Sequence, residues 1–362
     1  MLDATFTDSA CIDLHNAFEC IADTFPEMTL RGDPRGITFE GMDNSHVALM
    51  IYSIPSESFA AKKFMCQRST SIGLRSAGLR SIFKTIDKDT KSLTIRYDSI
   101  GSPHIIQILV EHNLSRVSEF SVLLSTLTPY IADTPQVFYS AEVRMPSFLL
   151  QRSCQDFRQF NDTIMLKVGL QKRGKDVVMD QENVAAFFSA DAQEGDIRFE
   201  DSSDISQSGD DQTAALCASY KALMTEIEGP DGAFIEIGNE GDIGGGTYRF
   251  VADPSATLNG DSLTSRDLFT RLDRENEKSV ALHTDPVVKD KRDGPLGNVC
   301  IAILEPIGSL RFSLRFLSAF SRAHRCSKEV LLSLKQNNPC RLQYNAGSTG
   351  DLVFYLAPNA SS

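Results

Sequence analysis

The residues best suited to chemistry in this sequence are its cysteines and histidines, and their spacing predicts no reactive centre. None of the eight cysteines forms a C-x-x-C pair, and the six histidines do not gather beside them at zinc-ligand spacing. Thiols among apolar residues behave as small hydrophobic groups. We therefore expect reduced core cysteines, no metal site and no cofactor. The cysteines are Cys11, Cys20, Cys66, Cys154, Cys217, Cys300, Cys326 and Cys340.

Two further patterns resemble fragments of active sites. The acidic pair Asp210-Asp211 stands in a polar, turn-rich segment, which is a poor place for acid–base catalysis. The run Gly244–Thr247 lacks the lysine of a phosphate-binding loop, so we expect a flexible turn there. No Ser/His/Asp or Cys/His set has a supporting context. The sequence therefore predicts no catalytic residue and a protein that is not an enzyme.

The elements that would position any binding residue fall into two halves of similar order, helix, strands, helix, strands. Apolar residues at three- and four-residue spacing predict the helices, and alternating apolar residues predict the strands. The expected helices are about 11–25, Ser76–Ile86, Pro146–Phe160 and Ser313–Ala323. The expected strands are Gly36–Glu40, His46–Ile54, 93–97, Ile105–Val110, 137–145, Thr163–Val168, Phe187–Ala190, Asp196–Glu200, Glu329–Leu334, Leu342–Tyr344 and Leu352–Leu356.

Length and composition fit this division. The 362 residues suit two domains, and 41% apolar with 23% charged residues is ordinary for a soluble globular protein. No apolar run approaches the roughly 20 residues of a membrane helix. The N-terminus is acidic where a secretory signal would be basic. We therefore expect a soluble protein made in the cytosol.

The net charge of −12 argues at first against a nucleic-acid partner. Residues 204–298, however, carry 18 acidic and nine basic side chains, which accounts for most of the excess. The same segment is glycine-rich and proline-punctuated, so we expect a loop insertion with at most a short helix at Ala214–Ile227 and a short strand at Tyr248–Val251. A smaller insertion is expected at about 170–183.

MDNSHVAL at Met42–Leu49 and DLVFYLAPN at Asp351–Asn359 are the most distinctive motifs of the chain. Between them stand SLRFLSAFSRA at Ser313–Ala323 and two supporting segments, Phe83–Asp98 and Val143–Phe157. In this order the motifs resemble those of the proliferating cell nuclear antigen (PCNA) family of eukaryotic-type sliding DNA clamps. The resemblance covers most of residues 1–203 and 299–362, and the insertion makes this chain a divergent member.

The resemblance implies an α+β DNA clamp fold, with two similar domains that each pack two helices on antiparallel sheets. The N-terminal domain would be 1–123, the interdomain connector 124–136 and the C-terminal domain 137–362. Three subunits would close head to tail into a ring with all helices lining the hole. The implied function is that of a processivity factor, which encircles duplex DNA and tethers polymerase and other replication and repair proteins.

If the helices line a DNA channel, their polar faces must be basic. Contacts of such side chains to phosphates are salt-dependent and independent of sequence, which permits sliding. A solvated helix face is the simpler explanation for any single pair, but recurrence on three helices favours DNA. The first helix has no lysine or arginine, unlike the family pattern. The residues expected to face DNA are Arg80, Lys84, Arg152, Arg158, Arg315, Arg322 and Arg325.

The resemblance also implies a peptide pocket and a subunit interface. The pocket would receive one helical turn carrying an aliphatic and two aromatic side chains, as in PIP-box-type peptides. Its expected residues are Met42, His46, Val47, Leu49, Tyr130, Ile131, Pro339, Tyr355, Ala357 and Pro358. Edge strands about 117–123 and 196–203 would pair between subunits through Val117, Phe120, Val122, Ile197 and Phe199.

Two alternatives stay open at this point. The chain could be one subunit of a heterotrimeric checkpoint-type clamp, or a clamp-derived interaction protein that does not encircle DNA. The intact motifs favour a homotrimeric replicative clamp. Its expected partners are duplex DNA, a DNA polymerase, a clamp loader and copies of itself, without a membrane. Its expected location is the nucleus, or a viral replication compartment if the source is a large DNA virus.

Overall fold

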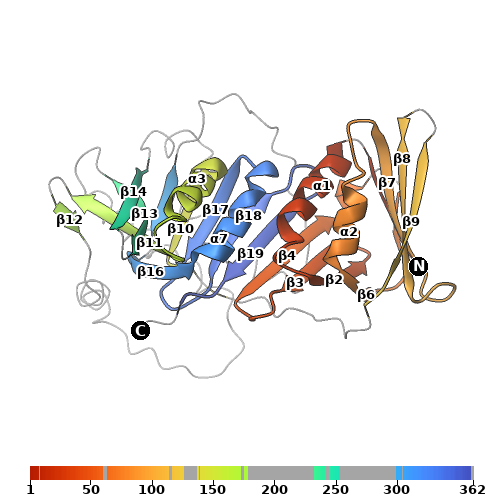
Figure 1. Ribbon diagram of the computed structural model, residues 1–362, viewed down its shortest axis with the longest axis horizontal. Helices are drawn as coiled ribbons and strands as arrows, with labels where there is room; N and C mark the ends of the chain where they lie inside the picture. The colour runs from red at the N-terminus through yellow and green to blue at the C-terminus, as the bar shows by residue number, and fades with distance from the viewer. Residues whose placement is uncertain are drawn as a thin grey trace, which may run out of the picture.

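The computed structural model describes residues 1–7, 9–59, 63–113, 116–125, 137, 139–172, 175–177, 232–241, 244–252, 299–303 and 305–359. They form an elongated molecule of two halves, with the N-terminal half in red to orange and the C-terminal half in yellow to blue (Figure 1). Among these residues no helix is long and apolar enough to cross a membrane. Cys20, Cys154 and Cys340 are buried free thiols, as expected, and Cys217 lies outside the described residues.

The described part of the N-terminal half contains two α-helices, one 3₁₀ turn and nine strands. In chain order these are β1 (Leu2–Thr7), α1 (Ser9–Ile21), β2 (Glu27–Asp33), β3 (Gly36–Met42), β4 (Ala48–Pro55), the 3₁₀ turn η1 (Ser56–Ser58), β5 (Phe64–Cys66), β6 (Thr70–Arg75), α2 (Ser76–Phe83), β7 (Thr90–Tyr97), β8 (Ile105–His112) and β9 (Val117–Leu123).

The described part of the C-terminal half repeats this order with one additional short strand. Its elements are β10 (Ala141–Pro146), α3 (Ser147–Phe157), β11 (Thr163–Lys172), β12 (Lys175–Val177), β13 (Ala233–Gly241), β14 (Gly244–Val251), β15 (Cys300–Ile303), β16 (Ile307–Ser313), α7 (Leu314–Phe320), the 3₁₀ turn η4 (Ser321–Arg325), β17 (Glu329–Leu334), β18 (Cys340–Asn345) and β19 (Asp351–Leu356).

The two halves have the same strand topology. In the N-terminal half the strands are ordered β5-β1-β7-β8-β9 and β4-β3-β2-β6, and in the C-terminal half β15-β10-β17-β18-β19 and β14-β13-β11-β16. Strand β12 is the additional element and pairs with the end of β11. The predicted internal repeat and the α+β clamp fold are therefore confirmed. The two halves are joined by antiparallel pairing of the last strand, β19, with the fourth strand, β4.

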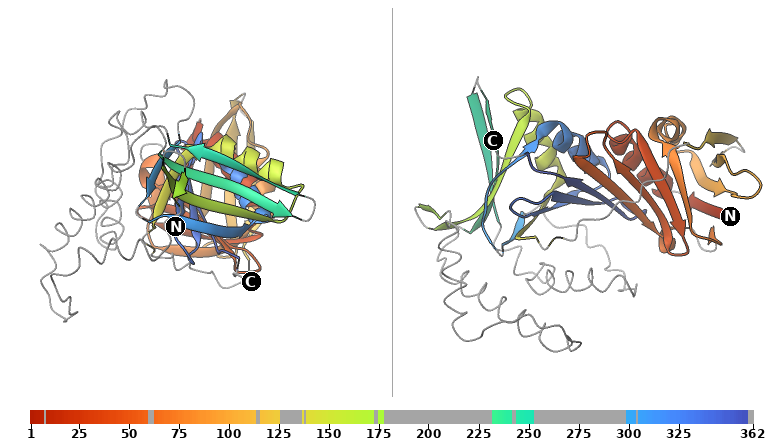
Figure 2. Two further views of the ribbon diagram at one scale, coloured as in Figure 1. Left: turned by 90° about the vertical axis from the view of Figure 1, so that its left-hand side faces the viewer. Right: turned by 90° about the horizontal axis from the view of Figure 1, so that it is seen from below.

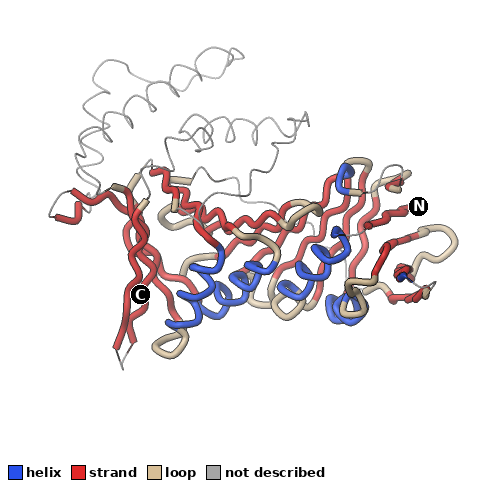
Figure 3. Tube along the Cα trace, turned by 90° about the horizontal axis from the view of Figure 1, so that it is seen from above, coloured by secondary structure: helices blue, strands red, loops and turns tan. Residues whose placement is uncertain are grey.

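The four α-helices of the described residues lie on one side of the sheets, as Figures 2 and 3 show from further directions. The apolar face of each helix is buried against the strands, which is the usual reason an amphipathic helix stays folded. The first residues of α2 and α7 are bonded alike to the loops before β2 and β11. The Ser76 N–H donates to the Pro26 carbonyl, and the Leu314 N–H donates to the Asp162 carbonyl.

An aromatic stack closes the core where the halves meet. The ring centroids of Phe320 in α7 and Phe354 in β19 are 4.4 Å apart, and the two rings are nearly parallel. The ring of Phe25 stacks on both. Nearby, the Tyr52 hydroxyl is 2.6 Å from that of Thr349, and Asp13 of α1 accepts bonds from the turn before β19. The junction between the halves is thus continuous sheet on one side and packed helices on the other.

One expectation about the insertion was wrong. Residues 204–298 are not a single loop outside the fold, because β13 and β14 lie within them and complete the second sheet. The run Gly244–Thr247 is likewise strand rather than a free turn, because it pairs with Gly238–Gly241 of β13. Strand β13 is buried along most of its length, as a core strand must be. The expected strands Phe187–Ala190 and Asp196–Glu200 and the helix Ala214–Ile227 lie outside the described residues.

Candidate peptide site and nucleic-acid interface

Three of the residues expected to form the peptide pocket stand in one row across neighbouring strands. Met42 of β3 is paired with Leu49 of β4, and Leu49 with Tyr355 of β19. Leu49 and Tyr355 are only 7% and 8% exposed. Because paired residues point to the same face of a sheet, the three side chains form a continuous apolar strip. The strip crosses the junction between the two halves.

The loop that borders this strip is held by one buried carboxylate. Asp43 accepts hydrogen bonds from the backbone N–H groups of Ser45 (2.9 Å), Val47 (2.8 Å) and Ala48 (2.6 Å) and from the Ser45 hydroxyl. Burial by itself would raise the pKa of the Asp43 carboxyl, but these hydrogen bonds outweigh it and hold the pKa below its usual value. The carboxylate therefore organises the loop while charged.

The same loop presents His46 to solvent in a left-handed backbone conformation, with φ of 57°. Its Nδ1 atom lies 3.0 Å from the Met42 sulfur, so the imidazole covers one end of the strip. This conformation is uncommon outside glycine and is tolerated best by residues such as Asn, Asp and His. The fixed loop therefore borders one side of the candidate peptide site, and the apolar strip forms its base.

The C-terminal tail forms the opposite border. The Ala357 N–H donates to the Val47 carbonyl at 3.0 Å, and the Asn359 N–H donates to the Arg311 carbonyl at 2.8 Å. Pro358, between them, is half-buried. Pro339 precedes Cys340, which is paired with Leu356 at the start of the tail. The structure thus brings the predicted residues of the loop, strip and tail to one region, while Tyr130 and Ile131 lie outside the described residues.

Sequence reasoning missed the second row of this face. Ile51 of β4 is paired with Val353 of β19, two residues along from Leu49 and Tyr355, and both are half-buried. Arg341 of β18 lies opposite Tyr355 and extends the first row by one strand. The period-two alternation of the two motifs contains the signal for Ile51 and Val353. The surface available to a peptide is therefore wider than the motif residues alone.

The expected DNA-facing residues all lie on the helical side of the molecule. Lys84, at the end of α2, and Arg158, at the end of α3, are exposed. Arg315 of α7 and Arg325 of η4 are exposed as well. Arg152 of α3 is also exposed and lies 3.6 Å from Asp156, one turn further along. These side chains form a basic surface along the described helices.

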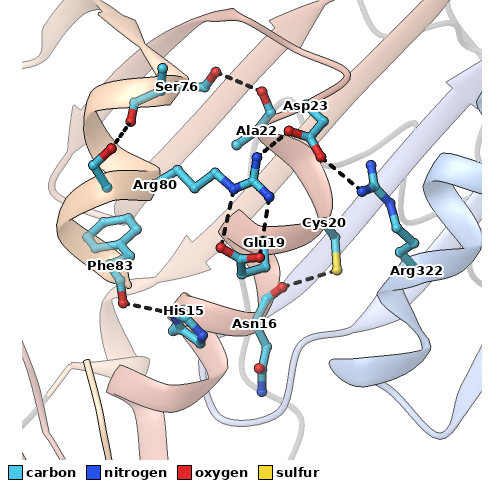
Figure 4. A network of polar contacts seen from close by, with 12 residues as sticks. His15, Asn16, Glu19, Cys20, Ala22, Asp23, Ser76, Arg80, Phe83 and Arg322 are labelled. Carbon is cyan, nitrogen blue, oxygen red and sulfur yellow. Dashed lines mark hydrogen bonds and ion pairs between the residues drawn. The ribbon is translucent and has the colours of Figure 1, made fainter. Parts of the chain in front are cut away.

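Arg80 and Arg322 differ from these five because acidic residues at the end of α1 and in the turn after it hold them (Figure 4). The Nε atom of Arg80 donates to Glu19 at 3.2 Å, and its Nη1 atom donates to Asp23. The other oxygen of Asp23 accepts from Arg322 at 3.0 Å. The hydrogen bond from Arg80 lowers the pKa of Glu19, and that from Arg322 lowers the pKa of Asp23. Four charges thus form a neutral network across α1, α2 and η4.

Strands β9 and β14 stand at sheet edges at opposite ends of the described fold. Strand β9 ends one sheet and β14 ends another. Val117 and Leu123 of β9 are 60% and 74% exposed, whereas Phe120 and Val122 pack against the core. Tyr248 and Val251 of β14 are also exposed apolar residues. Ile197 and Phe199, predicted for the second edge, lie outside the described residues.

Among the described residues no group of three or more His, Cys, Asp or Glu side chains could hold a metal ion. The candidate surfaces of the described chain are therefore the apolar strip, the helical face with its exposed cations, and the edge strands β9 and β14.

Comparison with known proteins identifies the family of the chain. Residues 1–129 match the model of the proliferating cell nuclear antigen N-terminal domain, and residues 285–359 match that of its C-terminal domain. Together the two matches cover more than half of the chain. The proliferating cell nuclear antigen of Dictyostelium discoideum is 28% identical over 191 residues, which is 53% of this chain and 69% of the relative. The chain belongs to the proliferating cell nuclear antigen family.

Proposed function

We propose that this protein is a sliding clamp that encircles duplex DNA and acts as the processivity factor of a DNA polymerase. The observation that carries the proposal is the placement of all four described α-helices on one side, with Lys84, Arg152, Arg158, Arg315 and Arg325 exposed there. Lysine and arginine on such a face bind phosphates without selecting a sequence, which is the contact that a sliding protein needs.

The repeat supports a head-to-tail assembly. Within the chain, the last strand of the second half, β19, pairs with the fourth strand of the first, β4. The equivalent strands of the opposite halves are β9 and β14, and both are open edges. A second copy that pairs its β14 with β9 would reproduce the junction seen within the chain and cover exposed apolar side chains. The interface we propose thus contains Val117, with Tyr248 and Val251 on the other side.

The assembly we propose is a homotrimer, in which six similar domains close the ring. It predicts a particle of three times 39.9 kDa in light scattering. A stable monomer would favour a clamp-derived interaction protein that does not encircle DNA. Assembly only with two other proteins would favour a heterotrimeric checkpoint-type clamp. Particle images of the purified protein would show directly whether the ring is closed.

The apolar strip of Met42, Leu49 and Tyr355, with the Asp43–Val47 loop and the tail, is the site proposed for partner peptides. A short helical turn with one aliphatic and two aromatic side chains would bury its apolar groups on the strip. Its backbone could bond to the tail, where strand pairing has ended. Polymerase, clamp loader and repair proteins would be tethered through such PIP-box-type peptides, in the nucleus or in a viral replication compartment.

The test is DNA synthesis on a primed circular template with a cognate polymerase and clamp loader. We expect long products in one binding event with the protein and short products without it. Linearising the template should abolish the effect, because a ring slides off free ends. Equal product lengths with and without the protein on circular DNA would refute the proposed function.

A further inference from the structure

The network in Figure 4 places acidic side chains where a DNA clamp needs free cations. Glu19 lies in the last turn of α1 and Asp23 in the turn that follows it, and they contact arginines from two other elements, Arg80 of α2 and Arg322 of η4. We propose that Glu19 and Asp23 occupy the phosphate-binding groups of these arginines and so weaken the hold of the N-terminal helices on DNA. The inference rests on the proposed function as a sliding clamp.

The geometry of the contacts supports this competition. A guanidinium presents its N–H groups as a planar fork that fits carboxylate and phosphate oxygens equally. All three nitrogens of Arg80 are used, because Nε and Nη2 face the Glu19 carboxylate at 3.2 and 3.5 Å and Nη1 bonds Asp23. A phosphate that approached Arg80 would have to displace a carboxylate and would then lie beside it.

Arg322 is held more loosely but by the same group. Its Nη1 atom bonds the second oxygen of Asp23 at 3.0 Å, and its Nε atom bonds the Ala319 carbonyl at 3.4 Å. One carboxylate therefore bridges two arginines from different halves of the chain. With two positive and two negative charges the network is neutral, so it gives a phosphate no net attraction at long range.

The cations left for DNA are distributed unevenly as a consequence. Within the described residues Lys84, Arg158, Arg315 and Arg325 form no ion pair, and three of these four belong to the C-terminal half. DNA in the ring should therefore be held mainly by α3, α7 and η4. Helix α1 has no lysine or arginine to offer to DNA. Because Glu19 and Asp23 pair with Arg80, the contribution of α2 to DNA binding is reduced as well.

The test compares two double variants with the same change of charge. Glu19→Gln with Asp23→Asn removes the two carboxylates from the network. The matched control, Asp3→Asn with Asp33→Asn, frees Arg96 and Arg35, which lie on strands and turns rather than helices. Each protein is titrated against a labelled linear duplex by fluorescence anisotropy at salt concentrations from 50 to 200 mM.

Each arginine that gains a phosphate should steepen the slope of log K against log salt by about 0.9. The ratio of the DNA association constants of the network variant and the wild-type protein should therefore change between 200 and 50 mM salt. It should be larger at 50 mM by about 3.5-fold if one arginine gains a phosphate, and by about twelvefold if two do. A further Arg80→Gln change should reduce this gain in the network variant and have little effect in the wild-type protein. A network variant that binds like the control would overturn the inference.

Retention on a nicked circular plasmid after loading separates this result from the proposed function. If the wild-type protein is retained and the network variant gains nothing, the inference fails and the clamp function stands. If the wild-type protein is not retained, the clamp function itself fails. Should the double variant not fold, Glu19→Gln alone removes the negative charge that faces Nε and Nη2 of Arg80 and leaves one acceptor oxygen there. In that variant the slope of log K against log salt should steepen by about 0.9, the value for one arginine. An unchanged slope would overturn the inference.

Discussion

Replacing Asp43 should test whether the loop beside the apolar strip is built for peptide binding. Its carboxylate is 6% exposed and accepts three backbone N–H groups and one hydroxyl. A hydrogen bond to a charged group contributes roughly 1.5–3 kcal/mol, and a buried N–H left without a partner costs roughly 1–3 kcal/mol. In Asp43→Ala, water can reach Ser45, but the Ala48 N–H stays buried.

We therefore expect Asp43→Ala to lower the free energy of unfolding by about 3 kcal/mol. Asp43→Asn keeps one acceptor oxygen and should lose about 1 kcal/mol, through the Ser45 contacts alone. Asp33→Ala is the control, because Asp33 also accepts a turn N–H, from Arg35 at 2.7 Å, but on an exposed turn. Urea denaturation at pH 7, followed by circular dichroism, measures all three variants.

The pH dependence of the Asp43→Asn effect has a defined sign. The native pKa of Asp43 lies below its unfolded value, so the charged carboxylate stabilises the fold above the unfolded pKa of about 4. This contribution is lost as the pH falls through the lowered native pKa. The difference between the wild-type protein and Asp43→Asn should therefore shrink when denaturation is repeated at about pH 3.

Peptide binding completes the test. Calorimetry with a peptide that carries one aliphatic and two aromatic residues on a helical turn should show at least tenfold weaker binding to Asp43→Ala than to Asp33→Ala. Unchanged peptide affinity would show that the loop is not part of the site. A stability loss below about 1 kcal/mol would show that the hydrogen bonds do not organise the loop.

Three further predictions follow from the junctions and the strip. Val117→Asp should shift the assembly towards the 39.9 kDa monomer in light scattering, whereas Ile100→Asp, on an exposed turn, should not, because burying an unpaired carboxylate costs about 2 kcal/mol or more. Phe354→Ala should lose about 3–5 kcal/mol in urea denaturation, against about 1 kcal/mol for the half-buried Phe316→Ala. Tyr355→Ala should weaken peptide binding tenfold or more in calorimetry and leave the assembly unchanged.

The amphipathic helices and alternating strands were predictable because local periodicity reports burial. The helices α1, α2, α3 and α7 overlap the four ranges expected from the sequence. Strand β13 escaped prediction because its neighbours in sequence are polar and glycine-rich, and its partner β11 is about 70 residues away. Pairing of that kind depends on tertiary contacts that no local pattern reports.

The candidate sites divide in the same way. Met42, Leu49 and Tyr355 were predictable by resemblance, and their register across three strands confirms that they lie together. The identity of Arg80 as a basic helical residue was also predictable. Its pairing with Glu19, 61 residues earlier, depends on how α1 packs against α2. Sequence therefore located the charges but not which of them neutralise one another.

The shared topology of the two halves has a consequence for the order in which they fold. In the first half, β2 pairs with β6 through residues such as Leu30 and Ile72, which are 42 positions apart. In the second, β11 and β16 pair through Ile164 and Phe312, which are 148 positions apart. Loop-closure entropy makes the second contact more costly by about 1 kcal/mol. The N-terminal half, which leaves the ribosome first, should therefore fold before the C-terminal half. Its strand β4 would then be in place when β19 of the C-terminal half pairs with it.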